Sequence, residues 1–482
     1  MKYFLLFLFF PYNKGGDYRK WYGNQEYVVN WENDGYEIRN IRGSNGKIRS
    51  RAQNTQFYFN QSISWSKISS GNIAFRYYPT GFIFDVAGCS IFLNENLNYI
   101  FGFLNSKVCG KILDLISPTL NYEVGHISSL PIIIDDSKKK CIDNLVLDNI
   151  NISKHDWDEK ETSWNFMKHP LINFNENLIE DSYRKMVENK QYQFNKLKQN
   201  EMDLNKLFAE IYNIPIDYDI DNKYISITSS KQEDIIKSFI SYSVGCMFGR
   251  YSLDEDGLKY AGGNFDLNDY NKFIPDNDNI IPISDFEYFE DDIVGRFVEF
   301  VKVCFGEKYL EKNLEFIGNS LSKSNNSSRE KIRNYFLKTF FIDHKNTYNK
   351  HPIYWQFSSG KENGFNCLIY IHRYEPSLVA RIRTDYLHKT QKAIEQQVTM
   401  CNNIINNSSS ATDKSKATKD KNKLQKQLKE TQNYDEVLAH IANQNIEIDL
   451  DEGVKENYNI FQSIEITMEG KKSKNVNLLK KI

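Results

Sequence analysis

The C-terminal third of the sequence has a spacing of apolar residues that restricts how the chain can fold. Residues at the two contact positions of a coiled-coil repeat alternate there: Leu387, Gln391, Ile394, Val398, Cys401 and Ile405. The Asn/Ser-rich segment 406–415 interrupts this series, because such residues do not easily continue a packed helix. Apolar positions then resume at Leu424, Leu428, Val437, Leu438 and Ile441. The pattern predicts an antiparallel helical hairpin over 386–445 with its tip near 407–414.

The rest of the chain combines short strand signals with longer helical periodicity. Strands are expected within 26–31, 82–86 and 353–371. Helical spacing predicts helices over 97–115, 181–212, 234–251, 286–305, 310–321 and 328–341. The polar stretch 135–140 is interpreted as a linker. The expected fold class is therefore multidomain α/β plus α: a mixed α/β domain, then mainly helical domains and the helical hairpin.

At 482 residues the chain has room for several domains. The shifts in pattern place boundaries at 11–135 for the α/β domain and 141–215 for a helical spacer. A mainly helical C-terminal domain follows over 216–385. The hairpin occupies 386–445, and 446–482 forms a C-terminal tail.

The apolar run Tyr3–Phe10 is too short to cross a bilayer, which takes about 20 residues. No small-residue cleavage site follows it, so we interpret it as a buried strand or a consequence of where the reading frame begins; secretion is the alternative. Seven cysteines without a Cys-x-x-Cys pair indicate neither a disulfide framework nor a zinc site. We expect a cytoplasmic protein without membrane contact.

Several motifs of catalytic centres are missing. None of the ten prolines forms the Pro-Pro pair of the Asn/Asp-Pro-Pro-aromatic loop that holds a target amino group in amino-methyltransferases. No two of the 24 glycines are spaced as Gly-x-Gly, which excludes the usual dinucleotide and methyl-donor loop. The stretch Ser252–Gly263 has Gly263 where a calcium loop needs Glu, so we interpret it as a turn. We expect no catalytic, cofactor-binding or metal-binding residues in this chain.

The first 76 residues are basic in a chain whose net charge is −2. They hold eleven Lys or Arg against five Asp or Glu, a net charge of +6. Arginine forks suit guanine edges and phosphates, and amides pair with adenine. The candidate DNA contacts are Arg39, Arg42, Lys47, Arg49, Arg51, Gln53, Asn54 and Arg76. The alternative is an exposed charged hairpin without function. Trp21, Trp31 and Trp65 are expected in the core rather than as stacking platforms.

The predicted C-terminal hairpin is also basic. Between Lys389 and Lys429 there are nine Lys against Glu395, Asp413 and Asp420, a difference of +6. This pattern is typical of a solvated helix face. An arm that contacts phosphates is the alternative.

Long strings of the sequence resemble one family. They include PYNKGGDYRKWYGNQEYVVNWENDGYEI at 11–38, GFIFDVAGCSIF at 81–92, PTLNYEVGHISSLPI at 118–132, PIYWQFSSGKENGFNCLIYIHRY at 352–374 and ANQNIEIDLDEGVKENY at 442–458. These strings are similar to the part that follows the catalytic domain in PglX-type adenine-specific DNA methyltransferases of BREX phage-defence systems. The resemblance covers nearly the whole chain from Pro11 onward. Complete members carry the methyl-donor and Asn-Pro-Pro-aromatic loops upstream, and this chain has neither.

The resemblance implies a C-terminal portion of such an enzyme, with a DNA target-recognition domain at 11–135. It adds Asn121, His126 and Ser128 as candidate DNA contacts, since recognition domains approach DNA in the loop before Leu130-Pro131. S-adenosylmethionine is the cofactor of the complete family enzyme, and this chain is expected to hold none and to be inactive alone. Its expected partner is double-stranded DNA, and a separate catalytic chain and other BREX components are further candidates.

Two other functions stay open at this point. The helical domains and the acidic stretch 447–452 fit a protein-interaction scaffold of a phage-defence complex, in which DNA contact is minor. The unmatched first ten residues fit an inert truncated product.

Overall fold

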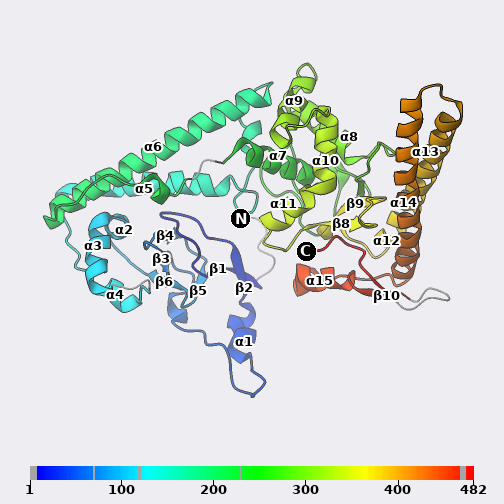
Figure 1. The fold of residues 1–482 in the computed structure, drawn as a ribbon. Coiled ribbons are helices and arrows are strands. Elements are labelled where there is room, and N and C mark those ends of the chain that lie inside the picture. Colours follow the sequence, from blue (N-terminus) through cyan, green and yellow to red (C-terminus); the bar gives the residue numbers. More distant parts are fainter. Residues whose placement is uncertain (1–7, 69–70, 118–120, 228–229, 467–473) are drawn as a thin grey trace. The chain divides into compact units, whose positions relative to one another are not determined.

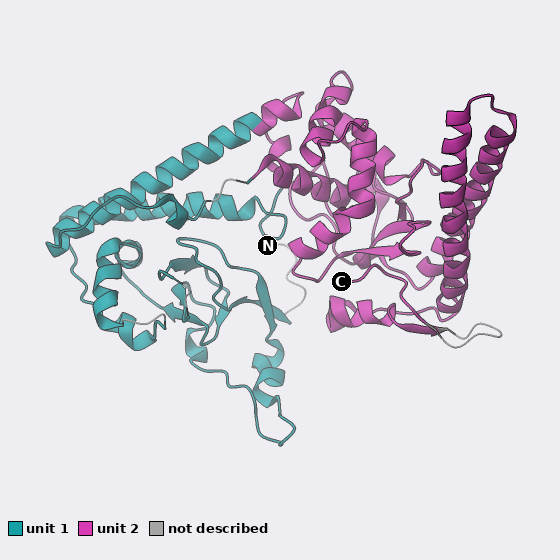
Figure 2. Cartoon of the chain, viewed as in Figure 1, with its two compact units in different colours: residues 1–167, 184–230 teal, residues 168–183, 231–482 magenta. Residues whose placement is uncertain are grey.

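The chain is a mixed α/β protein in which helices predominate (Figure 1). A computed structural model describes residues 8–68, 71–117, 121–227, 230–466 and 474–482. The chain divides into two compact units (Figure 2). Unit 1 comprises residues 1–167 and 184–230, and unit 2 comprises 168–183 and 231–482. The mixed α/β class is as predicted, whereas the five domain boundaries stay predictions.

Unit 1 contains two small sheets. In the first, β1 (Phe9–Asn13) pairs antiparallel with β2 (Tyr27–Asn30) and parallel with β5 (Ile83–Phe84). In the second, β3 (Ser62–Ser66) lies between β4 (Phe75–Tyr78) and β6 (Gly88–Ile91), antiparallel to both. The strands expected within 26–31 and 82–86 are confirmed by β2 and β5. Most of the N-terminal apolar run lies outside the described residues, and its last two residues begin β1.

The tryptophans of this region lie in the core, as predicted. Trp21 and Trp65 are 0% exposed and Trp31 is 6% exposed. The Trp65 ring lies 5.7 Å from the ring of Phe75 on the neighbouring strand, and the indole nitrogen donates to the carbonyl of Tyr122 at 2.9 Å. A buried indole N–H needs such an acceptor. These rings therefore stabilise the fold and are not available to stack on bases.

The helix expected over 97–115 is two helices, α2 (Leu97–Leu104) and α3 (Lys107–Ile116). The Asn105 amide between them imitates a strand partner: it accepts from the Phe75 N–H at 3.1 Å and donates to the Phe75 carbonyl at 3.2 Å. Ser106 then caps α3 by accepting from the Cys109 N–H at 3.2 Å. The bend exists because Asn105 hydrogen-bonds to the edge of β4, a contact that helical periodicity does not reveal.

The predicted linker at 135–140 is wrong, because α5 (Asp136–Asp158) begins there. Asp135 caps this helix by accepting from the Ser137 N–H at 3.0 Å. The long helix α6 (Ile179–Tyr212) begins in unit 2 and belongs to unit 1 from Arg184 onward. Its predicted extent, 181–212, is confirmed. A short helix, α4 (Val124–Ser128), precedes α5.

The α/β segment and the two long helices share one hydrophobic core. Buried residues from β3, β4, α2, α3, α5 and α6 form a single cluster that includes Ile63, Phe75, Phe101, Phe103, Val108, Ile142, Val146, Leu204 and Phe208. A Cβ added to Gly102 would lie 3.0 Å from the Val146 side chain, so the glycine allows α2 to approach α5 closely. Residues expected in a separate recognition domain and spacer thus fold together within unit 1.

Buried ion pairs cross this same junction. Arg19 donates to Asp156 of α5 at 2.9 Å, and Lys190 of α6 binds the other oxygen of that carboxylate at 2.7 Å. Asp156 is 5% exposed. Burial raises the pKa of the Asp156 carboxyl, but Lys190 and Arg19 outweigh burial and leave the pKa below its usual range.

Glu201 of α6 makes a second buried contact of this kind. It accepts from the Lys20 ammonium at 2.8 Å and from the Trp21 indole N–H at 2.7 Å. Burial lowers the pKa of Lys20, but Glu201 outweighs that effect, so the net pKa is raised. Charges buried at this depth are stable only because each has its partner.

Unit 2 is mainly helical. Its helices before the hairpin are α7 (Gln232–Met247), α8 (Ile293–Phe305), α9 (Leu310–Leu321), α10 (Ser328–Lys338), α11 (Phe340–Thr347) and α12 (Leu378–Arg381). The prediction over 310–321 matches α9. The helix expected over 286–305 begins only at Ile293, where Asp292 caps it, and the one expected over 328–341 breaks at Thr339.

A three-stranded sheet lies within unit 2, in the order β7 (Ile281–Pro282), β9 (Asn366–Tyr370), β8 (Tyr354–Ser358). The strands expected within 353–371 are confirmed. His344 of α11 accepts from the N–H groups of Ile353 and Tyr354 at 3.1 and 3.0 Å, at the start of β8. Burial lowers the pKa of His344 to about 3, which keeps the ring neutral and able to accept.

Helices α13 (His388–Asn407) and α14 (Ala411–Ala442) pack along the predicted seam (Figure 1). Ile394 and Cys401 meet Ala417 and Leu424 in one buried cluster. The turn between the two helices is shorter than the Asn/Ser-rich segment 406–415, because Ser410 accepts from the Asp413 N–H and caps α14, which begins at the next residue. The C-terminal part contains α15 (Val454–Ile460) and the antiparallel pair β10 (Ile464–Ile466) and β11 (Lys474–Val476). No helix in the described part of the chain is both long and apolar enough to cross a membrane.

We predict that Asp156→Ala strongly destabilises unit 1. The substitution leaves Arg19 without a carboxylate partner, whereas Lys190 keeps its ion pair with Glu159. A broken buried pair costs about 3 to 5 kcal/mol of unfolding free energy. Urea denaturation gives the change, and hydrogen exchange of α5 peptides assigns it to unit 1. Asp148→Ala on the same helix is the control: its pair with Lys196 is 3.8 Å long and exposed, so the loss stays below about 1 kcal/mol.

The contribution of Asp156 also depends on pH. Because the folded-state pKa of Asp156 is lowered, its stabilisation is present above the unfolded-state pKa of about 3.9 and is lost as the pH falls through the folded-state value. The stability difference between the native chain and Asp156→Asn should therefore shrink below about pH 4. A urea series from about pH 7 to about pH 3 measures it. A difference that stays constant over this range would contradict the assignment.

Candidate nucleic-acid interface

The basic cluster of unit 1 begins on α1 (Glu32–Asn40), which follows β2. Its first turn is irregular: Asn33, Asp34 and Gly35 all have positive φ. A Cβ on Gly35 would lie 2.5 Å from the Trp31 ring, so only glycine permits the chain to fold over this buried indole. The Arg39 guanidinium lies 5.3 Å from the same ring. Trp31 thus fixes the base of the segment that carries the cations.

A small hairpin follows α1. Ile41 accepts from the Arg49 N–H at 2.8 Å, and the Gly43 N–H donates to the Lys47 carbonyl at 2.8 Å. Gly46 closes the turn at φ 73°, with its N–H donating to the Gly43 carbonyl at 2.9 Å. Figure 1 shows this loop extending beyond α1, away from the sheets of unit 1. We call residues 39–54 the arginine loop.

The arginine loop is positively charged along its whole length. No Asp or Glu occurs between Arg39 and Asn54. Arg39 is half-buried and binds Asp34 at 3.1 Å, and Arg42 donates to the Gly46 carbonyl at 2.9 Å. The remaining cations are exposed and make no side-chain hydrogen bond or ion pair within the described residues: Lys47, Arg49 and Arg51. Three charges without partners are therefore presented to solvent.

The two amides predicted as base readers lie at the end of the same loop. Gln53 and Asn54 are both exposed, and Asn54 adopts a left-handed conformation with φ 57° before a short 3₁₀ turn. The structure thus places Gln53 and Asn54 on the segment that carries Arg49 and Arg51. Apolar side chains that the sequence did not single out are exposed beside these cations: Ile41 is 47% and Ile48 is 54% exposed. In the sequence, Ile41 and Ile48 each directly precede an arginine, and this pattern could have indicated that they are exposed beside the cations.

Arg76 does not belong to this surface. It is 1% exposed, and its guanidinium donates to the Arg19 carbonyl at 3.3 Å and to Ser66 Oγ at 2.9 Å. Burial lowers the pKa of Arg76. Arg76 is too deeply buried to contact DNA. The sequence-based prediction that Arg76 contacts DNA is therefore wrong. Its charge satisfies backbone carbonyls inside unit 1.

Three further candidates, Asn121, His126 and Ser128, lie at or next to α4. This helix lies apart from the arginine loop in unit 1 (Figure 1). Asn121 donates to Glu123 at 3.0 Å, and His126 Nδ1 accepts from the Glu123 N–H at 3.3 Å, which caps α4. Exposed Ser128 donates to the Gly125 carbonyl at 3.0 Å. Each of these side chains already has a local role at α4. The string 118–132 begins with residues 118–120, which lie outside the described residues.

The described residues do not fit an S-adenosylmethionine site. Such a site needs a parallel sheet whose first strand leads through a glycine-rich loop into a helix. Among the described strands the one parallel ladder joins β1 and β5 over two residue pairs, and β1 leads to β2 rather than to a helix. No group of three or more His, Cys, Asp or Glu among the described residues could hold a metal ion.

No protein-family model matches the chain. It is 41% identical over 462 residues to a protein named adenine-specific methyltransferase PglX from Lacticaseibacillus casei (strain Zhang). It is 36% identical over 486 residues to a protein named adenine-specific methyltransferase BrxX from Escherichia coli O9:H4 (strain HS). The chain is a relative of the PglX-type adenine-specific methyltransferases. The predicted family is confirmed by these matches.

The matches cover 93% and 94% of this chain. They cover only 38% and 39% of the two relatives, so this PglX relative spans less than half of their length.

We predict that substitutions of two arginines of this PglX relative differ in their effect on stability. Arg76→Gln leaves buried carbonyls without a donor, which costs about 1 to 3 kcal/mol of unfolding free energy. Arg49→Gln removes an exposed charge without a partner and changes stability by less than about 0.5 kcal/mol. Urea denaturation of both variants measures the contrast. Equal destabilisation would show that Arg49 has a structural role.

Proposed function

We propose that this chain is the DNA target-recognition portion of a PglX-type adenine-specific DNA methyltransferase of a BREX system. In this proposal the chain binds duplex DNA and directs a catalytic domain to the adenine that is methylated. One observation supports the proposal most: the arginine loop projects from unit 1 with exposed cations that have no carboxylate partner within the described residues. The kinship with proteins named adenine-specific methyltransferases makes DNA the polyanion that fits it.

The side chains divide between two tasks. Lys47 and Arg42 would neutralise backbone phosphates and set the register of the protein on the duplex. Arg49 and Arg51 would place guanidinium forks against guanine edges, and Gln53 would pair with adenine in the major groove. These tasks need a short, projecting segment, and the two-stranded hairpin within residues 39–54 has this form.

The proposal does not assign the methyl-transfer reaction to the residues of this chain. An enzyme that modifies the adenine amine rotates the base out of the duplex into a closed pocket. S-adenosylmethionine supplies the methyl group in the complete enzyme, and the described residues form no site for it. In the proposal this chain selects the DNA site, and a catalytic domain performs the reaction in the same protein or in a separate chain.

A protein-docking role is the second candidate, and a different surface favours it. Ile132, Ile133 and Ile134 are consecutive and are 41%, 46% and 39% exposed. Adjacent exposed apolar side chains mark contact sites more often than single ones. This segment of unit 1 would bind the catalytic domain or another protein of the defence system.

We predict that the chain binds duplex DNA in a strongly salt-dependent manner and that Arg49→Glu/Arg51→Glu weakens this binding. Each phosphate that the variant no longer neutralises reduces the slope of log K against log salt concentration by about 0.9. Fluorescence anisotropy with a labelled duplex measures both affinity and slope. The variant should bind at least about tenfold more weakly at low salt.

Lys140→Glu/Lys206→Glu is the matched control, because it makes the same charge change at exposed positions of unit 1 that form no ion pair within the described residues. The control should retain most of the binding. If both double variants weaken DNA binding equally, the arginine loop has no special role and the proposal fails. If neither does, the docking function is the better explanation.

A further inference from the structure

Four lysines of α14 lie on one face of the helix. Lys416, Lys419, Lys423 and Lys426 are spaced three, four and three residues apart, the spacing that places side chains on a common face. They extend over about 15 Å at 1.5 Å per residue. All four side chains are exposed. We call this row the lysine stripe.

Most of the stripe is not neutralised. Lys423 binds Asp285 at 2.5 Å, whereas Lys416, Lys419 and Lys426 make no ion pair within the described residues. The segment 411–429 contains seven Lys against Asp413 and Asp420. On an exposed helix face that is stabilised by salt bridges, charges of both signs alternate along the length. This face carries an excess of one sign.

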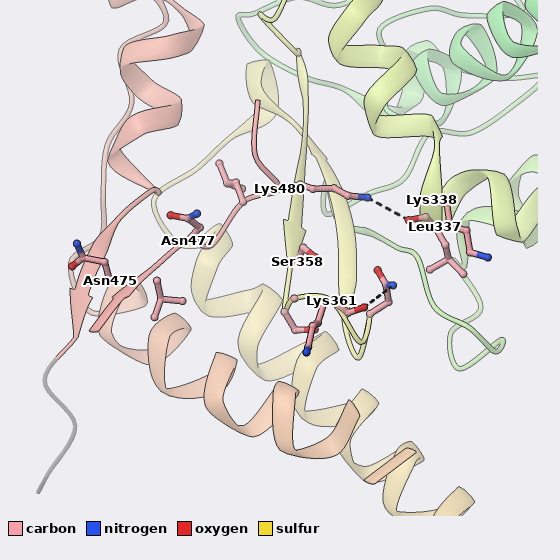
Figure 3. A pocket seen from close by; sticks show the side chains of 12 residues that line it. Leu337, Lys338, Ser358, Lys361, Asn475, Asn477 and Lys480 are labelled. Carbon is pink, nitrogen blue, oxygen red and sulfur yellow. Dashed lines mark hydrogen bonds between the residues drawn. The ribbon is translucent and has the colours of Figure 1, made fainter. Parts of the chain in front are cut away.

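A basic cavity lies in the same unit (Figure 3). Its volume is about 560 Å³, and Lys338, Lys361 and Lys480 line it together with Asn363 and Asn477. None of its twelve lining residues is acidic. Lys361 lies 3.9 Å from the carboxylate of Glu362, which is not a lining residue, so Lys338 and Lys480 are the lysines of the cavity without an ion pair within the described residues. Lysines around one hollow favour an anionic ligand.

Lys480 is the most enclosed of these three lysines. Its ammonium donates to the Leu337 carbonyl at 3.3 Å and lies 3.5 Å from Gln356 Oε1, without a carboxylate among its contacts within the described residues (Figure 3). Burial lowers the pKa of Lys480. An anion in the cavity would stabilise the charge that burial disfavours.

Glu430 connects the stripe to the cavity. It lies four residues after Lys426 and therefore on the same face of α14. Its carboxylate accepts from Ser359 Oγ at 2.8 Å, the Glu362 N–H at 2.8 Å and the Gly364 N–H at 3.1 Å. The loop 358–361 at this contact lines the cavity. The stripe thus leads along α14 to the cavity rim.

We propose that the lysine stripe and the basic cavity form a track in unit 2 that binds the phosphate backbone of nucleic acid, in addition to the arginine loop of unit 1. The length of the stripe favours a polymer over a small phosphate ester. A duplex presents one charge per about 1.7 Å of axis, so about nine phosphate charges lie within 15 Å. Lysine suits this task, because it supplies point charges without reading base edges. The track therefore adds affinity and no sequence preference.

The test compares two triple variants of the full chain by anisotropy with a labelled duplex. Lys416→Gln/Lys419→Gln/Lys426→Gln should weaken binding at least about tenfold at low salt and lower the salt slope by about 2 to 3. Lys312→Gln/Lys323→Gln/Lys350→Gln removes the same charge from exposed lysines of unit 2 outside the track, and it should change neither quantity. Lys338→Gln/Lys361→Gln tests the cavity, with an expected slope change of about 1 to 2.

Further outcomes distinguish this inference from the proposed function. The track variants should weaken binding to all duplex sequences equally, whereas Arg49→Gln/Arg51→Gln should reduce discrimination between sequences. Equal affinity in the two lysine triple variants would overturn the track and leave the arginine loop untouched. An unlabelled poly-glutamate that competes as well as unlabelled duplex at equal charge would show that the surface fits acidic proteins, and would also overturn it. Circular dichroism of each variant verifies that the fold is retained.

Discussion

The fold of unit 1 depends on two carboxylates that long helices hold inside it. Asp156 of α5 and Glu201 of α6 each bind cations from the segment 19–21, which connects β1 to β2. Such pairs add little net stability compared with apolar packing, but breaking one leaves a buried charge and is costly. They therefore specify where the N-terminal segment lies against the helices. The surrounding hydrophobic core then stabilises that one arrangement.

The need of a buried charge for a partner divides the cations of the basic N-terminal segment into two groups. Arg19, Lys20 and Arg76 are used inside unit 1, where carboxylates or backbone carbonyls surround them. Lys47, Arg49 and Arg51 are exposed and have no partner within the described residues. The net charge of the segment does not distinguish these groups. Within this segment, three of the exposed cations without an ion pair lie on the loop, so positive potential is concentrated where the chain projects from unit 1.

Features set by local periodicity could be predicted from the sequence, and features set by distant partners could not. The seam of α13 and α14 and the bounds of α9 follow from apolar spacing within each segment. The break at Asn105 depends on a strand thirty residues earlier, and the burial of Arg76 depends on Ser66 and the chain near Arg19. The start of α5 was missed because 135–140 is polar, although Asp135 is a good cap. For the candidate site, the sequence located the arginine loop but not which of its cations are free.

A cationic loop attracts every duplex, so selection of one DNA sequence requires that its side chains are held in a defined place. Unit 1 supplies such a support at the base of the loop. Gly35 folds over the buried Trp31 ring, and Arg39 lies near that ring while it binds Asp34. The backbone hydrogen bonds from Gly43 and Arg49 then define the hairpin that carries the free cations. The exposed charges of the arginine loop are thus joined through Trp31 to the buried cluster that it forms with Tyr58 and Ile83, and recognition by base-edge contacts requires such a rigid support.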